Sequence, residues 1–282
     1  MDIARTIADL RRRISPWRRS EERLGLVPTM GALHRGHMAL VQAARTECHR
    51  VLVSIFVNPK QFAPSEDLGS YPRRAAADLE MLSAAGVELV FMPAVEEIYP
   101  AQFTTLVRVT GLTDVLCGAH RPGHFDGVAT VVTKLLIQSL PDAAYFGEKD
   151  YQQLVVVRRL TRDLDIPVRI VGVPTVREPD GLALSSRNAY LSPEERQIAP
   201  NIARVLRGVA NAVARRSTTI TLELARGCDE LRNAGVAVEY LEIRNSETLT
   251  PNGNLVKPRE AACSRCCTQW HPKHLLAPEQ KN

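Results

Sequence analysis

Aromatic residues are scarce in this sequence, at 5% of the chain. Proteins that bind single-stranded nucleic acid stack bases on aromatic side chains, so this scarcity argues against that function. The sequence also lacks any run of the roughly 18 apolar residues that a membrane-spanning helix requires. Residues 1–14 have no continuous apolar stretch of the kind found in secretory signals, and their pattern is that of an amphipathic helix. We therefore expect a cytoplasmic protein with no membrane or nucleic-acid partner.

Positive charge is in modest excess, with 36 Lys and Arg against 31 Asp and Glu, a net charge of +5. The arginines are scattered along the sequence, so an anionic small-molecule substrate explains the excess more economically than RNA does. A chain of 282 residues, 45% of them hydrophobic, can build a core without disulfides. The six cysteines are therefore expected to stay reduced in the cytosol.

The first part of the chain alternates short apolar runs with amphipathic helical patterns. The predicted strands are residues 23–28, 51–57, 87–93, 142–146 and 167–174, and the predicted helices are 36–48, 72–86, 127–140 and 150–164. Strands and helices that alternate at this spacing are typical of a parallel, doubly wound sheet. The predicted fold class is α/β, with a Rossmann-like domain over residues 1–176.

The pattern changes in the second part of the chain. Ser192, Pro193 and Glu195 form the start signal of a helix, which is predicted to run over 192–216. A second helix over about 221–234 and a strand over 236–244 follow. These elements predict a smaller α+β lid domain over residues 177–282.

The stretch PTMGALHRGH, residues 28–37, carries the clearest chemical signal. It follows a predicted strand and opens a predicted helix, which is where open α/β sheets bind ligands and where helix amides attract anions. His34 and His37 are therefore placed to donate hydrogen bonds to phosphate oxygens. Two histidines could also be half of a metal site, but no nearby carboxylate or cysteine completes one. The G-x-G-x-x-G and G-x-x-x-x-G-K-[ST] fingerprints are absent.

Three further stretches add polar groups at predicted turns. FGEKDYQQL (146–154) places Lys149 and Asp150 after a strand, where they could meet a phosphate and a ribose hydroxyl. LALSSRNAYLS (182–192) offers two serine hydroxyls and Arg187, which suit a clamp on phosphates. FVNPKQF (56–62) presents two amides that suit a small substrate with hydroxyl and carboxylate groups. No nucleophile–base pair for a covalent acyl-enzyme accompanies them.

Taken together, these stretches resemble one protein family. The segments are PTMGALHRGH, SIFVNPKQF, YPRR, RPGHFDGVATVV, FGEKDYQQL and DGLALSSRNAYLS. In this order, from about residue 3 to about residue 250, the sequence resembles the pantoate–β-alanine ligases, a branch of the H-x-G-H nucleotidyltransferases. The resemblance implies that pantoate attacks the α-phosphate of ATP to give pantoyl adenylate and pyrophosphate. β-Alanine then displaces AMP, with Mg²⁺ accompanying the ATP, and the enzyme is expected to be a homodimer.

The resemblance also assigns roles to individual residues. His37 is implied as the proton donor, with His34, Lys149 and Arg187 completing the catalytic set. The implied ATP-binding residues are Met30, Gly31, Ala32, Leu33, His34, Arg35, Gly36, His37, Gly147, Glu148, Lys149, Asp150, Val176, Leu184, Ser185, Ser186 and Arg187. The implied substrate-binding residues are Asn58, Gln61, His124 and Gln153. Asp78 is a candidate contact for the Mg²⁺, whose protein ligands the sequence leaves unknown.

Three alternatives to this function stay open at the level of sequence. Another H-x-G-H nucleotidyltransferase, such as a cytidylyltransferase, would not need the Gln61 and Gln153 pair. A basic RNA-binding protein would bind nucleic acid with a steep salt dependence. An inactive relative would keep the fold and fail to turn over substrate.

The tail from about residue 251 is atypical of the family. Cys263, Cys266, His271 and His274 form a C-x₂-C-x₄-H-x₂-H pattern, which is too compact for a zinc module. The sudden content of Cys, Trp and Pro favours an altered reading frame near residues 250–260. The tail also lacks the apolar strand that would pair with residues 236–244.

Overall fold

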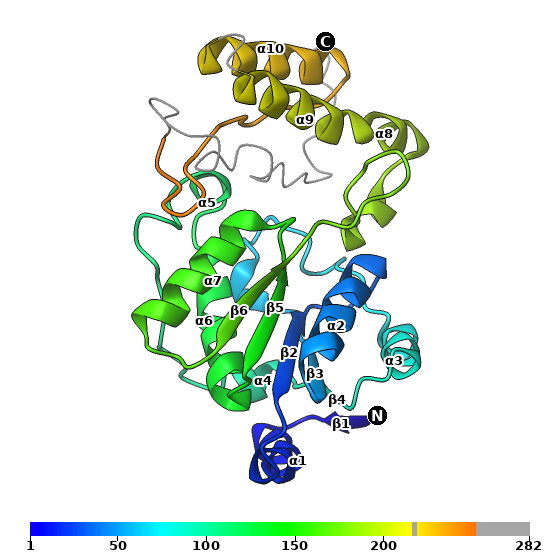
Figure 1. Ribbon diagram of the computed structural model, residues 1–282, viewed down its shortest axis with the longest axis vertical. Coiled ribbons are helices and arrows are strands. Elements are labelled where there is room, and N and C mark those ends of the chain that lie inside the picture. The colour runs from blue at the N-terminus through cyan, green and yellow to red at the C-terminus, as the bar shows by residue number, and fades with distance from the viewer. Residues whose placement is uncertain (216–218, 252–282) are drawn as a thin grey trace. The chain divides into compact units, whose positions relative to one another are not determined.

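The computed structural model of the chain describes residues 1–215 and 219–251 (Figure 1). The chain divides into two compact units. The first unit comprises Met1–Glu148 and Gln153–Pro174, and the second comprises Lys149–Gln152 together with the chain from Thr175 onward. Within the described ranges, no helix combines the length and hydropathy that crossing a bilayer demands.

A six-stranded parallel sheet forms the centre of the first unit. Its strands, in spatial order, are β1 (Asp2–Ala4), β4 (Leu89–Phe91), β3 (Arg50–Ile55), β2 (Leu24–Thr29), β5 (Ala143–Gly147) and β6 (Arg169–Val173). From β2 the chain continues outward through β3 and β4, and it then returns to add β5 on the other side of β2. The order therefore reverses between β2 and β5, and such a reversal is where α/β sheets open a ligand crevice at the carboxyl ends of their strands.

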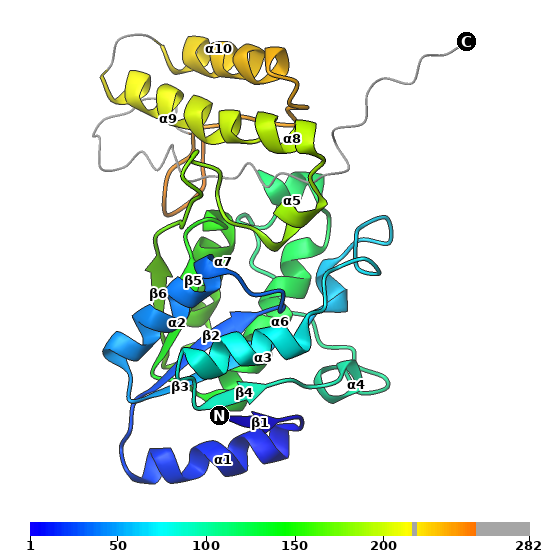
Figure 2. The same ribbon diagram turned by 90° about the vertical axis from the view of Figure 1, so that its right-hand side faces the viewer.

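Helices surround the sheet and connect its strands. They are α1 (Ile7–Arg19), α2 (Arg35–Glu47), the short 3₁₀ turn η1 (Pro59–Gln61), α3 (Ala75–Ala84), α4 (Val95–Ile98), α5 (Cys117–His120), α6 (His124–Ser139) and α7 (Tyr151–Asp163). Figure 2 shows α2 and α3 together on one side of the sheet. The α/β fold class and the five strands predicted between residues 23 and 174 are confirmed.

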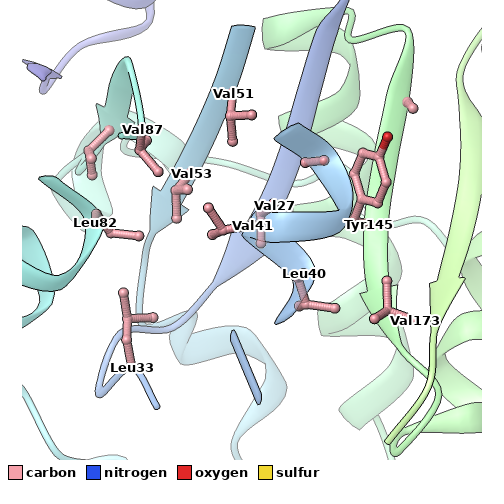
Figure 3. Close-up of a cluster of buried hydrophobic side chains, with 13 residues drawn as sticks. Val27, Leu33, Leu40, Val41, Val51, Val53, Leu82, Val87, Tyr145 and Val173 are labelled. Atoms are coloured by element: carbon pink, nitrogen blue, oxygen red, sulfur yellow. The ribbon is translucent and has the colours of Figure 1, made fainter. Parts of the chain in front are cut away.

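One hydrophobic core cluster lies where α2 and α3 pack on the sheet (Figure 3). Val41 of α2 packs with Val27 of β2 and Val53 of β3, and Leu82 of α3 belongs to the same cluster. Leu33 joins this cluster from the loop between β2 and α2 and is 9% exposed. The loop that carries the two histidines is therefore anchored to the core by its own apolar side chain.

The amino-terminal segment differs from its sequence prediction. Residues 1–14 were expected to form one amphipathic helix, but Asp2–Ala4 form the edge strand β1, paired with β4. The helix α1 begins only at Ile7, where the Thr6 hydroxyl accepts a hydrogen bond from the amide of Asp9. A strand of three residues is too short to give a periodic signal in the sequence.

The second unit contains η2 (Ser186–Tyr190), α8 (Pro193–Ile198), α9 (Pro200–Ala214) and α10 (Ile220–Asn233). The predicted capping box is confirmed, since Ser192 and Glu195 exchange side-chain to backbone hydrogen bonds. The single helix predicted over 192–216 is wrong, because the chain forms two helices that meet at Pro200. Proline has no amide hydrogen for the helical ladder, so a new helix starts there.

The strand predicted over 236–244 is also absent from the described part of the second unit. Val236 and Ile243 instead pack against α9 and α10. Among the described residues, the segment is bridged only between Arg244 and Pro251. The described part of the second unit is therefore helical with isolated bridges. The α+β lid domain predicted over 177–282 includes residues outside the described ranges and stays a prediction. Residues 252–282, with the zinc-like pattern and the proposed change of reading frame, lie outside the described residues. The described cysteines Cys48, Cys117 and Cys228 are not in disulfide bonds.

Candidate functional site

The histidine turn begins at the carboxyl end of β2. The Thr29 hydroxyl donates to the carbonyl of Ser54 on β3 at 2.7 Å and accepts from the amide of Gly31 at 3.2 Å. The next two residues have left-handed backbones, with φ of 81° at Gly31 and 50° at Ala32. A side chain at Gly31 would also approach an oxygen of Asp78 to 3.0 Å, so glycine is required there. The chain is thereby turned sharply out of the sheet before α2 begins.

A buried carboxylate holds this turn in place. Asp78 of α3 is 3% exposed, and its two oxygens accept hydrogen bonds from the consecutive amides of Ala32 and Leu33, at 2.9 and 2.8 Å. Sequence reasoning considered Asp78 only as a Mg²⁺ contact. The structure gives it a bracing contact with the loop, because a carboxylate that accepts two amide hydrogens fixes the backbone between them.

The two histidines cap α2 with their own rings. Nδ1 of His34 accepts from the amide of Gly36 at 3.1 Å, and Nδ1 of His37 accepts from the amide of His34 at 3.3 Å. The ring centroids are 4.1 Å apart. Because both Nδ1 atoms act as acceptors, each neutral ring carries its proton on Nε2. The first turn of α2 holds no acidic residue. The two ring N–H donors therefore add to the positive potential at the start of the helix, with no negative side chain in that turn to offset it.

A cluster of amides follows β3 and contacts the histidine turn. Gln61 of η1 donates from Nε2 to the sulfur of Met30 at 3.2 Å and accepts at Oε1 from Asn58 at 3.0 Å. Asn58 is 1% exposed, and its Nδ2 also donates to the carbonyl of Gly127 at 3.1 Å. The structure therefore joins two predicted sites, the phosphate turn and the amide pocket, through the contact between Met30 and Gln61.

Tyr99 completes the amide cluster, although sequence reasoning did not select it. Its hydroxyl donates to Oδ1 of Asn58 at 2.8 Å. Burial raises the pKa of this phenol, so Tyr99 remains a protonated donor throughout the physiological range. No local pattern marks this residue, since it lies 41 positions from its partner.

His124 is held from two sides at the start of α6. Its Nδ1 lies 2.8 Å from the backbone carbonyl of Gln61, and its Nε2 lies 3.2 Å from Nη1 of Arg121. Arg121 forms a two-armed ion pair with Glu66, at 2.8 and 2.5 Å. Burial alone would lower the pKa of Arg121, but its partners, chiefly Glu66, raise it above the ordinary value. Sequence reasoning chose His124 and missed Glu66 and Arg121.

The candidate residues at the end of β5 and after it are divided between the two units of the chain. Gly147 ends β5 beside β2, and the amide of Glu148 donates to the carbonyl of Val173. Lys149 and Asp150 form an ion pair at 3.2 Å, with both side chains about one-third exposed. Gln153 is partly exposed on α7, as the predicted substrate contact requires.

The candidate clamp of the second unit is a compact turn. The amide of Leu184 donates to the carbonyl of Val176 at 3.0 Å, so these two predicted ATP contacts are neighbours. The hydroxyl of Ser185 accepts from the amide of Arg187 and caps η2, which also contains Ser186. Within the described ranges, no group of three or more His, Cys, Asp or Glu could hold a metal ion.

Comparison with known proteins decides the family. A sequence model described as pantoate-beta-alanine ligase matches residues 2–271. The chain belongs to the pantoate–β-alanine ligase family. The match continues past residue 250, where the resemblance read from the sequence was expected to end.

Individual members of the pantoate–β-alanine ligase family are similar over most of their length. The pantothenate synthetase of Paramagnetospirillum magneticum is 52% identical over 257 residues, which is 91% of this chain and 90% of the relative. The crystal structure of pantothenate synthetase from Thermus thermophilus superposes with a TM-score of 0.84 at 51% identity, covering 89% of this chain and 90% of that one.

A third relative in the pantoate–β-alanine ligase family was solved with bound ligands. The enzyme from Francisella tularensis, complexed with β,γ-ATP and β-alanine, superposes with a TM-score of 0.75 at 36% identity. It covers 86% of this chain, and this chain covers 89% of it.

Proposed function

We propose that this chain is an ATP-dependent ligase that joins pantoate to β-alanine through an amide bond. A carboxylate oxygen of pantoate attacks the α-phosphorus of ATP and displaces pyrophosphate, which leaves pantoyl adenylate. The β-alanine amine then attacks the acyl carbon, the carbon–oxygen bond to AMP breaks, and the amine loses a proton. Membership of the ligase family and the β-alanine found on the Francisella relative support this reaction.

One contact carries the proposal at the level of geometry. Gln61 reaches the sulfur of Met30, so the amide cluster suited to a hydroxy acid adjoins the turn suited to phosphates. Pantoate bound at the amide cluster and ATP bound at the turn would bring the attacking carboxylate close to the α-phosphate. Catalysis then consists of positioning and charge stabilisation, which alone supply large rate factors.

His34 and His37 are the proposed donors to the phosphates. Each ring keeps Nδ1 as an acceptor, so Nε2–H is the group that meets an oxygen of the leaving pyrophosphate. The backbone amides at the start of α2 add to the positive electrostatic potential that these oxygens experience. Lys149, Ser185, Ser186 and Arg187 are proposed as further phosphate contacts, and Asn58, Gln61 and Gln153 as pantoate contacts.

Magnesium enters this proposal as part of the substrate MgATP. The described residues offer no ready-made cluster of ligands, and both oxygens of Asp78 already accept amide hydrogens. Mg²⁺ bound to nucleotides keeps several waters and is held mainly by the phosphates, so such a site needs few protein ligands. Homodimer formation remains an expectation from the family resemblance, and a cytoplasmic location remains a prediction from the sequence.

Exchange of labelled pyrophosphate into ATP tests the first step in the absence of β-alanine. The expected result is exchange that requires both pantoate and Mg²⁺. His37→Ala should lower the exchange rate by about 10²–10³, the usual effect of removing one transition-state donor. Exchange that does not require pantoate, or an exchange rate that His37→Ala leaves unchanged, would contradict the proposal.

A further inference from the structure

A second set of contacts, from residues outside the amide cluster, reaches the backbone of Gln61. Glu66, Arg121 and His124 form a chain of contacts, here called the Glu66–Arg121–His124 triad, that ends on the backbone carbonyl of Gln61. Arg121 also reaches this carbonyl directly, with Nη2 at 3.4 Å. The side chain of Gln61 is meanwhile occupied with Asn58 and Met30. Gln61 is thus fixed at its backbone as well as its amide.

The geometry determines which nitrogen of His124 carries the proton. A carbonyl oxygen only accepts, so Nδ1 of His124 must donate to Gln61. Nε2 faces a guanidinium nitrogen of Arg121, which only donates, so Nε2 must accept. The ring is therefore neutral and protonated on Nδ1, the opposite tautomer to that of His34 and His37. Both polar atoms of the ring are engaged by the protein.

The ion pair gives this arrangement its rigidity. The side chains of Arg121 and Glu66 are each 12% exposed, so the pair is largely withdrawn from water. A guanidinium at such a site needs its carboxylate, because a buried charge left without a partner is strongly destabilising. The planar, two-armed contact also fixes the orientation of Arg121 and hence of the nitrogen that faces His124.

We propose that Glu66, Arg121 and His124 are positioning residues, which hold Gln61 where its amide can bind the pantoate group. This inference rests on the proposed function, and it changes the role of His124 from a substrate contact to a support. The triad acts on the pantoate pocket through Gln61. Its main expected effect is on pantoate, because the phosphate turn has its own brace in Asp78.

Kinetics of single and double variants test the triad. We expect Glu66→Gln to raise the KM for pantoate in the exchange assay about tenfold, as loss of a supporting partner typically does, and to change the KM for ATP less than about twofold. In a Gln61→Ala background the same substitution should have no further effect, because the supported amide is gone. Glu80→Gln, at an exposed glutamate of α3, is the matched control and should leave both constants unchanged. Equal rises in the two KM values, or additive effects in the double variant, would overturn the proposal.

A histidine spectrum tests the same proposal without any turnover. In protein labelled with ¹⁵N-histidine, the signals lost in His124→Asn should belong to an Nδ1–H ring. The rings of His34, His37 and His49 should be Nε2–H, since their Nδ1 atoms accept from backbone amides. A His124 ring protonated on Nε2 would refute the triad. Absence of pantoate-dependent exchange in the unaltered protein would instead refute the proposed function, and the spectrum would then decide the triad alone.

Discussion

At the scale of single residues, Asp78 shows how one carboxylate can organise a binding turn. Its two oxygens hold the amides of Ala32 and Leu33, the residues directly before the first histidine. The partners are 46 and 45 positions apart, so their contact follows from the tertiary packing of α3 against the loop after β2. The histidines could be found from the sequence because their spacing is local. The brace could not, since a lone aspartate in a helical pattern has no distinguishing signal.

Asp78→Asn should destabilise the protein and weaken ATP binding. The amide can accept only one of the two amide hydrogens, and its own NH₂ group would face the other, which costs about 1–3 kcal/mol at a buried site. Urea unfolding and the KM for ATP measure these two effects. Asp229→Asn, at an exposed helix position, is the control and should change stability by less than about 0.5 kcal/mol.

The Mg²⁺ role first considered for Asp78 predicts a different outcome. A metal ligand replaced by an amide would raise the Mg²⁺ concentration required for exchange and leave the urea midpoint unchanged. That pattern would contradict the bracing role.

At the scale of elements, the approach of α6 to η1 sets the position of the amide cluster. A Cβ atom at Gly127 would lie 2.2 Å from the carbonyl oxygen of Lys60 and 2.7 Å from the amide nitrogen of Gln61. The two backbones therefore meet where no side chain fits. The sequence predicted a helix over 127–140, which overlaps α6, but it gave no indication of η1 or of this contact.

Gly127→Ala is expected to displace η1 and raise the KM for pantoate. The overpacking should also lower the free energy of unfolding by roughly 1–3 kcal/mol, because backbone atoms are harder to move than a flexible side chain. Gly208→Ala in α9 is the control, since nothing lies within 4 Å of its added methyl. That change should stabilise the protein by about 0.5–1 kcal/mol through helix propensity. Thermal unfolding and exchange kinetics of the two variants provide the comparison, and a Gly127→Ala protein that matches the unaltered one would refute the close approach.

Sequence reasoning succeeded for elements with strong local patterns and failed for those that depend on partners. The run over 51–57 contains the β-branched side chains of a buried strand, and β3 is present there. The apolar run over 236–244 alternates as well, but Val236 and Ile243 are used to pack against helices. Propensity is therefore overridden where the described residues offer no neighbouring strand.

At the scale of the whole molecule, the order of the strands explains the location of the site. The reversal between β2 and β5 brings the loops after these strands to the same edge of the sheet, and these loops carry His34 and Glu148. The alternating pattern predicted a parallel sheet but could not give the order of its strands. The position of β1 beside β4 depends on a pairing over nearly 90 residues, which no local pattern encodes.

The central claim is that a carboxylate oxygen of pantoate attacks the α-phosphorus of ATP, and oxygen transfer tests it most directly. Pantoate labelled with ¹⁸O in its carboxylate would be incubated with the chain, MgATP and β-alanine, and the products analysed by mass spectrometry. We predict one ¹⁸O atom in the phosphate of AMP, one in the amide carbonyl of the product, and none in pyrophosphate. Unlabelled AMP, or label in pyrophosphate or inorganic phosphate, would contradict the adenylate route.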